Sequence, residues 1–133
     1  MFFKLKISKA DKLFSKVIRE RSNWTCERCY VDCIDDKGYL HCSHFHSRAK
    51  KSVRFDLDNA AALCAACDHY FTDPLHKHDH EMFFLKRLGL NRLNMLEVRA
   101  NTPQNVDENL MEIYLKAKLI EFEKEHESIG ANR

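Results

Sequence analysis

Apolar residues recur at helical spacing near the start of the chain. A Ser8-x-x-Asp11 capping box opens this stretch, and the pattern predicts a helix that ends near Asn23. The apolar stripe of this helix consists of Leu13, Phe14, Val17 and Ile18. The alternation of apolar residues and lysines over residues 3–7 favours a short edge strand, or else a frayed terminus.

The second half of the chain also has a helical pattern. Helices are predicted over residues 80–88, where Gly89 ends the pattern, and over residues 90–100. The periodicity then breaks, and Asp107 caps a long final helix. The apolar face predicted for this helix consists of Leu110, Ile113, Tyr114, Ala117 and Ile120. That face either packs on its own domain, which we favour, or pairs with a second subunit in a homodimer.

Between the helical regions, short apolar runs alternate with turn-forming residues. The segment 35–38, Asp-Asp-Lys-Gly, predicts a hairpin between residues 30–34 and residues 38–42. The second strand of this hairpin would deliver the histidine-rich segment 41–46. The remaining elements expected here are a short return strand over residues 53–55 and a helix from about Cys67 to residue 73.

The composition indicates a soluble single domain. The chain has 133 residues, 32% of them charged, with 3 Gly and 2 Pro, so long loops should be few. We find neither a signal peptide nor an apolar run of about 20 residues, which predicts a cytoplasmic protein without a membrane span. Residues 1–54 hold 13 Lys and Arg against 6 Asp and Glu, whereas residues 55–133 hold 9 against 14. The basic half favours binding of nucleic acid, although a solvated helix face plus an acidic tail would give the same charge asymmetry.

The cysteines change this picture more than the charge does. Two Cys-x-x-Cys pairs, Cys26 with Cys29 and Cys64 with Cys67, are typical of a closed tetrahedral site for Zn²⁺. Four thiolates leave no open coordination position, so the predicted zinc is structural. A redox dithiol is the alternative. Two cysteines are left over, and we expect buried free thiols there, with a ligand swap as the other possibility: Cys33 and Cys42.

A candidate hydrolytic site surrounds the second cysteine pair. His44 lies near a predicted strand end, Asn59 follows fifteen residues later, and Asp68 comes directly after Cys67. Cutting a phosphodiester needs a base to deprotonate water, and histidine has a suitable pKa. It also needs a divalent ion to stabilise charge on the phosphate, which a carboxylate can hold. These spacings alone are a weak signal, because a lone histidine is more often a polar surface residue.

Basic and histidine-rich stretches flank this site. The loop between His44 and Asn59 carries four cations that would contact DNA phosphates without reading sequence: Arg48, Lys50, Lys51 and Arg54. An equally favoured interpretation pairs Arg54 with Asp56 or Asp58. The alternating histidines of segment 76–80 resemble a metal tract, but an exposed loop before a helix is the simpler interpretation.

The combined pattern resembles the zinc-stapled HNH (ββα-metal) endonucleases, and in detail the phage recombination nucleases of the NinG (Rap) type. The residues that carry the resemblance span about two-thirds of the chain: Ile18-Arg19-x-Arg21, Cys26-x-x-Cys29, Cys42-Ser43-His44-Phe45-x-Ser47-Arg48, Arg54-Phe55-Asp56-x-Asp58-Asn59, Leu63-Cys64-x-x-Cys67 and Leu88-Gly89. It implies an α+β, mainly helical fold in one domain. A ββα-metal, treble-clef-like core with a four-cysteine zinc site would occupy residues 8–73, and a helical extension residues 74–133.

The resemblance also implies roles for individual residues. His44 would be the general base, Asn59 would orient the loop that positions it, and the four cysteines would hold zinc. Asp68 stands where the family usually has His or Asn as a ligand of the catalytic metal, here Mg²⁺ or Mn²⁺. Ser43 stands where the wider HNH group often has a carboxylate or histidine ligand. Compensating candidates lie close by: His41, His46 and His69.

These implications add up to a hypothesis with two rivals. The favoured function is metal-dependent hydrolysis of DNA, on branched or single-stranded substrates, during phage or prophage recombination in a bacterial host cell. The first rival is a non-catalytic zinc-dependent DNA-binding module, which the residues at positions 43 and 68 motivate. The second rival is a thiol-redox or metal-handling protein.

Overall fold

The computed structural model describes residues 6–131, with side chains to residue 127. Five helices and two strands follow in the order α1 (Lys9–Arg21), β1 (Leu40–His44), β2 (Ala60–Cys64), α2 (Ala65–Thr72), α3 (Lys77–Leu88), α4 (Leu90–Ala100) and α5 (Glu108–Ala131). Short 3-10 turns occupy the connections: η1 (Lys37–Tyr39), η2 (Lys51–Val53), η3 (Leu57–Asn59) and η4 (Pro74–His76). The strand expected over residues 3–7 falls mostly outside the described residues.

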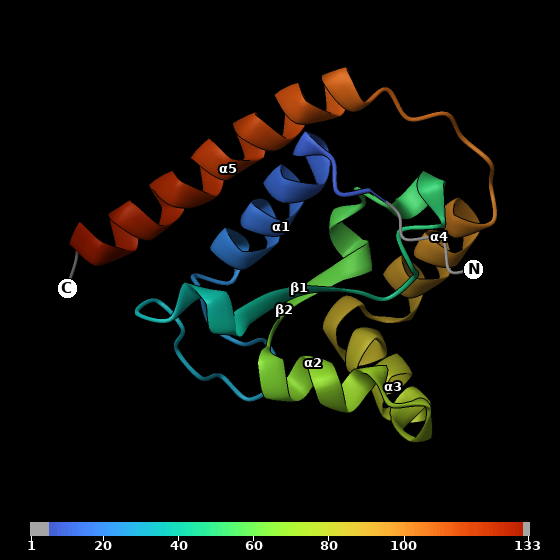
Figure 1. Ribbon diagram of the computed structural model, residues 1–133, viewed down its shortest axis with the longest axis horizontal. Helices are drawn as coiled ribbons and strands as arrows, with labels where there is room; N and C mark the ends of the chain where they lie inside the picture. Colours follow the sequence, from blue (N-terminus) through green and yellow to red (C-terminus); the bar gives the residue numbers. More distant parts are fainter. Residues whose placement is uncertain (1–5, 132–133) are drawn as a thin grey trace.

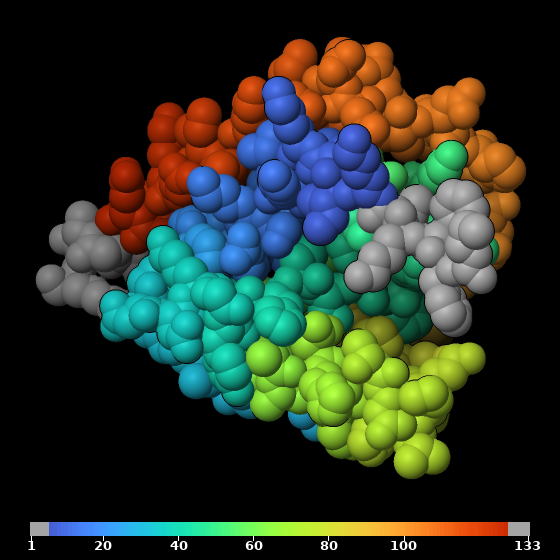
Figure 2. All heavy atoms as spheres, in the orientation of Figure 1, coloured from blue at the N-terminus to red at the C-terminus, as the bar shows by residue number. Residues whose placement is uncertain are grey.

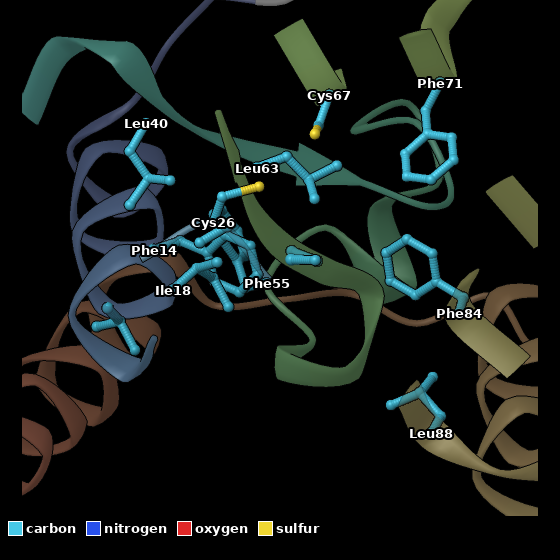
Figure 3. Packing of buried hydrophobic residues seen from close by; sticks show 14 of the residues in the cluster. Phe14, Ile18, Cys26, Leu40, Phe55, Leu63, Cys67, Phe71, Phe84 and Leu88 are labelled. Carbon is cyan, nitrogen blue, oxygen red and sulfur yellow. The ribbon is translucent and has the colours of Figure 1, made fainter. Parts of the chain in front are cut away.

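The two strands form an antiparallel sheet that lies between helices (Figure 1). The register pairs Leu40 with Cys64 and His44 with Ala60. Phe14 and Ile18 of α1 pack on one side of the sheet, and Phe71 of α2 packs on the other side with residues of α3 (Figure 3). This mainly helical α+β arrangement agrees with the predicted fold class, and α2 follows β2 directly.

The partner predicted for β1 is wrong. Residues 30–34 form no strand, and the segment before β1 contains only an isolated bridge between Thr25 and Asp32 and the turn η1. The cysteine knuckle, which is the turn around Cys26 and Cys29, folds this segment back on itself, and residues 30–34 therefore do not extend alongside β1. Nor do residues 53–55 return as a strand, since the turn η2 ends at Val53. The true partner is β2, whose alanines favour strands weakly but are all buried between helices.

The predicted helices are confirmed, and two of them have shifted starts. Both hydrogen bonds of the Ser8–Asp11 capping box are present at the start of α1. Helix α2 begins two residues before the predicted Cys67, and α3 begins at Lys77 rather than residue 80. Gly89, with a φ of 81°, separates α3 from α4. None of the described helices combines the length and the apolar character that crossing a membrane requires.

The apolar face predicted for α5 is also wrong. Helix α5 lies along α1 (Figure 1), and Leu115 of α5 is fully buried. The neighbours of Leu115 on the packed face are Met111, Leu119 and Phe122. Leu110 and Ile113 of the predicted face are 65% and 66% exposed. Because α5 carries two apolar stripes, its pattern alone could not indicate which of them meets α1. A homodimer stays a prediction.

Candidate metal centre and active site

The four predicted zinc ligands meet in space. Cys26 and Cys29 come from the knuckle after α1, Cys64 ends β2, and Cys67 lies in the first turn of α2. Their sulfur atoms all lie within 4.8 Å of one another, and the Sγ atoms of Cys29 and Cys64 are 3.7 Å apart. A tetrahedron with Zn–S bonds of about 2.3 Å requires sulfur separations near 3.8 Å. The cluster therefore fits a structural Zn²⁺ and not a disulfide, whose sulfurs lie about 2.0 Å apart.

The surroundings of this cluster suit thiolate ligands. The backbone N–H of Cys29 donates to the Sγ of Cys26 at 3.5 Å, and Arg28 Nη1 donates to the Sγ of Cys67 at 3.5 Å. The Arg28 guanidinium also lies over the Tyr70 ring. Such contacts orient the ligands and offset their negative charge. The two remaining cysteines are free thiols outside the cluster, and Cys33 is buried as expected, whereas Cys42 is only partly buried.

The sheet has one capped edge and one open edge. Glu27 accepts a hydrogen bond from the Ala62 N–H at 2.6 Å through its carboxylate, and its own N–H donates to the Ala62 carbonyl at 2.8 Å. Arg87 holds the same carboxylate at 3.0 Å. This closes the outer edge of β2. The outer edge of β1 instead borders a groove of about 520 Å³ between β1 and α1, which both His41 and His44 line.

His44 lies on the α1 side of β1, with its ring 5.3 Å from the Phe14 ring. Its Nε2 is 3.3 Å from the Arg54 carbonyl oxygen. Because a carbonyl can only accept, Nε2 carries the proton in this contact and Nδ1 keeps its lone pair. Burial lowers the pKa of His44 below its usual value, and Arg48 adds to this effect. The imidazole is therefore neutral at pH 7, with one basic nitrogen.

Asn59 fixes the loop that carries this carbonyl. The side chain is fully buried, and its Nδ2 donates to the carbonyls of His46 at 3.0 Å and Val53 at 3.1 Å. Its Oδ1 accepts from the His46 N–H at 2.8 Å. The amide thus joins the two ends of the loop between β1 and β2, next to Arg54. This is the contact pattern expected of a residue that positions the candidate base.

Replacing Asn59 by Asp should therefore destabilise the protein. The carboxylate keeps the shape of the amide but loses both donors and faces two carbonyl oxygens. Leaving buried groups unpaired costs about 1–3 kcal/mol each, so for the two carbonyls we expect a loss of about 2–6 kcal/mol of unfolding free energy. Thermal or urea denaturation measures it. The matched control is Asn94→Asp on the exposed face of α4, and equal stability of the two variants would contradict the role of Asn59.

Asp68 pairs with His41, not with His44. Its Oδ2 is 2.9 Å from the Nδ1 of His41, and both side chains are partly exposed. His69 is exposed on α2, and Ser43 is buried on the other side of β1 from His44. A carboxylate beside an imidazole suits a divalent ion such as Mn²⁺. Within residues 6–127, however, only the four cysteines bring three or more ligand atoms together, so the remaining ligands of such an ion would be water or phosphate oxygens.

The four loop cations differ in their surroundings, because the two arginines pair with Asp11 and the two lysines are exposed. Arg54 pairs with Asp11 of α1, its Nε donating at 2.9 Å. The ion-pair interpretation is thus confirmed, but its predicted partners are wrong: Asp56 binds Arg99 and Asp58 binds Arg92. Arg48 Nη1 also reaches Asp11, at 3.3 Å. Lys50 and Lys51 are exposed, and Lys50 Nζ lies 3.4 Å from Asn101 Oδ1. A local search along the sequence misses Asp11 because it lies 43 residues from Arg54.

The remaining histidines do not form a metal tract. His46 Nε2 is 2.7 Å from Glu97 of α4, which ties it to the scaffold. His76 stacks on Tyr70, and His78 is exposed. His80 packs among aromatic rings, with its Nε2 buried and without a hydrogen-bond partner. Burial lowers the pKa of His80, although Asp68 opposes this.

Comparisons with known proteins agree with this picture at the level of the family. No curated protein matches the chain, and no solved structure matches it. The family described as "Bacteriophage Lambda NinG protein" matches residues 4–125, a span that contains the cysteine cluster, the groove and most of α5. The chain therefore belongs to the NinG family.

Proposed function

We propose that this protein is a metal-dependent DNA endonuclease that acts in phage recombination or repair inside the bacterial host cell. The observation that carries the proposal is the groove between α1 and β1. It holds a neutral histidine with a free Nδ1 beside a histidine that is paired with a carboxylate. Membership in the NinG family supports the phage setting.

In this proposal His44 is the general base. The Arg54 carbonyl fixes the Nε2–H tautomer, and Asn59 fixes the loop that carries that carbonyl. The Nδ1 lone pair of His44 then accepts a proton from the water that attacks the phosphorus. Burial of the imidazole lowers the pKa of His44, the cation of Arg48 adds to this effect, and both keep His44 from being protonated before substrate binds.

Asp68 would hold the catalytic divalent ion, with His41 as the second protein ligand. When bound, the ion supplies positive charge to the phosphate and to the departing oxygen. Asp68 and His41 lie on the opposite face of β1 from His44, and of these two only His41 lines the groove together with His44. An ion held there would approach a phosphate in the groove from the side of His41. A mixed carboxylate and imidazole pair favours Mn²⁺ over Mg²⁺.

A specific observation also favours the non-catalytic rival. Ser43 is 7% exposed and offers only a neutral hydroxyl where a carboxylate would be a stronger metal ligand. If the ion binds too weakly, the chain would be a zinc-stapled DNA-binding module. A redox role has less support, because the four clustered sulfurs have the separations of metal ligands.

The test is cleavage of supercoiled plasmid, single strands and a four-way junction by purified protein. We expect nicking with Mn²⁺, slower nicking with Mg²⁺, and none after dialysis into divalent-free buffer. Asp68→Ala should lose at least about a hundredfold in rate at fixed Mn²⁺, because it removes the charged ligand. Asp35→Ala, in the exposed turn before η1, is the matched control. Retained DNA binding without cleavage under every metal would instead support the rival.

A further inference from the structure

The groove beside His44 has a wall that the loop cations do not supply. One face of α1 lines it with Lys12, Ser15 and Arg19, which follow one another at helical spacing. The opposite wall is the edge of β1. Phe14, which packs on the His44 ring, lies on the buried side of α1, whereas the polar face with Lys12 and Arg19 borders the groove. The groove therefore holds the candidate base and two cations of α1 in one lining.

Lys12 and Arg19 remain available to bind phosphate, whereas Arg54 does not. Lys12 is exposed, whereas Arg54 is bound by Asp11. Asp11 also lines the groove, but its charge is offset by Arg54 and by Arg48. Arg19 donates through Nε to the Ser15 carbonyl at 3.2 Å, and its guanidinium lies over the Trp24 ring. The ammonium of Lys37 lies over the same ring, so two cations gather at this end.

We infer that the groove-lining face of α1 binds the backbone of a single DNA strand and guides it across His44. The inference rests on the proposed nuclease function and names its substrate class. The main phosphate contacts would then be made by α1 and not by the loop that follows β1. Figure 2 shows the outer face of α1 uncovered beside the segment that leads into β1.

The dimensions of the groove favour one strand. Lys12 and Arg19 are seven residues apart, which is about 10 Å along a helix axis. Each strand of B-DNA has one phosphate per about 3.4 Å, so two cations at this separation can contact phosphates of the same strand. The ring of His44 is half-buried against α1, so a phosphate has to enter the groove to reach it. A flexible single strand can follow such a groove, whereas duplex DNA is stiff over about 150 base pairs.

Binding without cleavage tests this inference. Fluorescence anisotropy of a labelled oligothymidylate of about twenty nucleotides is measured in divalent-free buffer, beside a duplex of equal length. We expect tighter binding of the single strand, and a loss of at least about tenfold in the double variant Lys12→Glu with Arg19→Gln. The slope of log affinity against log salt should fall by about 0.7 for each lost phosphate contact. Lys77→Glu, at the exposed start of α3, should leave binding unchanged.

The variants are chosen so that a folding defect does not imitate the result. Glutamate at position 12 lies near the start of α1, where negative charge favours a helix. Gln at position 19 keeps a polar side chain beside Trp24, and the Lys12→Glu single variant should already lose several-fold in affinity. Unchanged binding by the folded variants, or tighter binding of the duplex, would overturn the inference. Cleavage is a separate readout. Strand binding through α1 without any cleavage would reject the nuclease alone, and cleavage with unaltered variant binding would reject this inference alone.

Discussion

Loss of the metal from the four-cysteine cluster is expected to unfold this protein. The knuckle segment between α1 and β1 has almost no regular structure, and the cluster fastens it to β2 and α2. Three of the four cysteines belong to the hydrophobic core, and the sulfurs of Cys26 and Cys67 turn toward the same space (Figure 3). Structural zinc contributes about 10–16 kcal/mol in small domains, which equals or exceeds the whole stability of most domains. A strong chelator should therefore abolish the cooperative thermal transition.

Cysteine variants make the prediction specific. Cys64→Ser should leave less than one zinc per chain by elemental analysis and should give little folded protein. The matched control is Cys33→Ser, which alters an equally buried thiol outside the cluster. It should keep one zinc and cost about 1–3 kcal/mol of stability, as expected for a buried polar substitution. Zinc loss in the Cys33 variant together with zinc retention in the Cys64 variant would show that the ligand set is different.

The parts of the fold that could be predicted from the sequence are those with local signals. The capping box of α1, the glycine between α3 and α4 and the Asp107 cap of α5 each depend on residues within one turn. The pairing of β1 with β2 depends on tertiary burial, because a run of alanines has little strand preference of its own. The packed face of α5 could not be predicted from the sequence either, because contact with α1 determines which of the two apolar stripes is buried.

The candidate site shows the same division. The cysteine pairs define their own chemistry by spacing, and the roles of His44 and Asn59 come from the resemblance rather than from any local pattern. Three features of the site join segments that are far apart in the sequence, and they therefore depend on the folded chain. They are the pairing of Asp68 with His41, the pairing of Arg54 with Asp11, and the position of the basic face of α1 beside β1. The periodicity of apolar residues predicts which side of α1 is buried. It does not predict that the polar side of α1 borders the groove.

Substitution of His44 should remove the metal-dependent cleavage that we propose. A general base contributes about a hundredfold to ten-thousandfold to rate, so His44→Ala should lose at least about a hundredfold. His44→Asn is the companion variant, because it keeps a polar side chain where alanine would leave a cavity beside Phe14. Both variants should retain zinc and bind single-stranded DNA as the unaltered protein does. His78→Ala, at an exposed position of α3, is the control that should cleave normally.

The pH dependence of cleavage tests whether His44 acts as the base or only as a binding residue. Burial and the cation of Arg48 lower its pKa, while the Arg54 carbonyl and the carboxylate of Asp11 oppose that shift. Since the neutral form is active, the rate should rise with pH, with its inflection below the usual histidine pKa of about 6.5. Folding stability should fall on the same acid side, because the unfolded chain binds the proton more tightly. Residual cleavage by His44→Asn should lack this inflection. A rate that still falls below pH 6.5 in the same way in that variant would assign the proton transfer to another group.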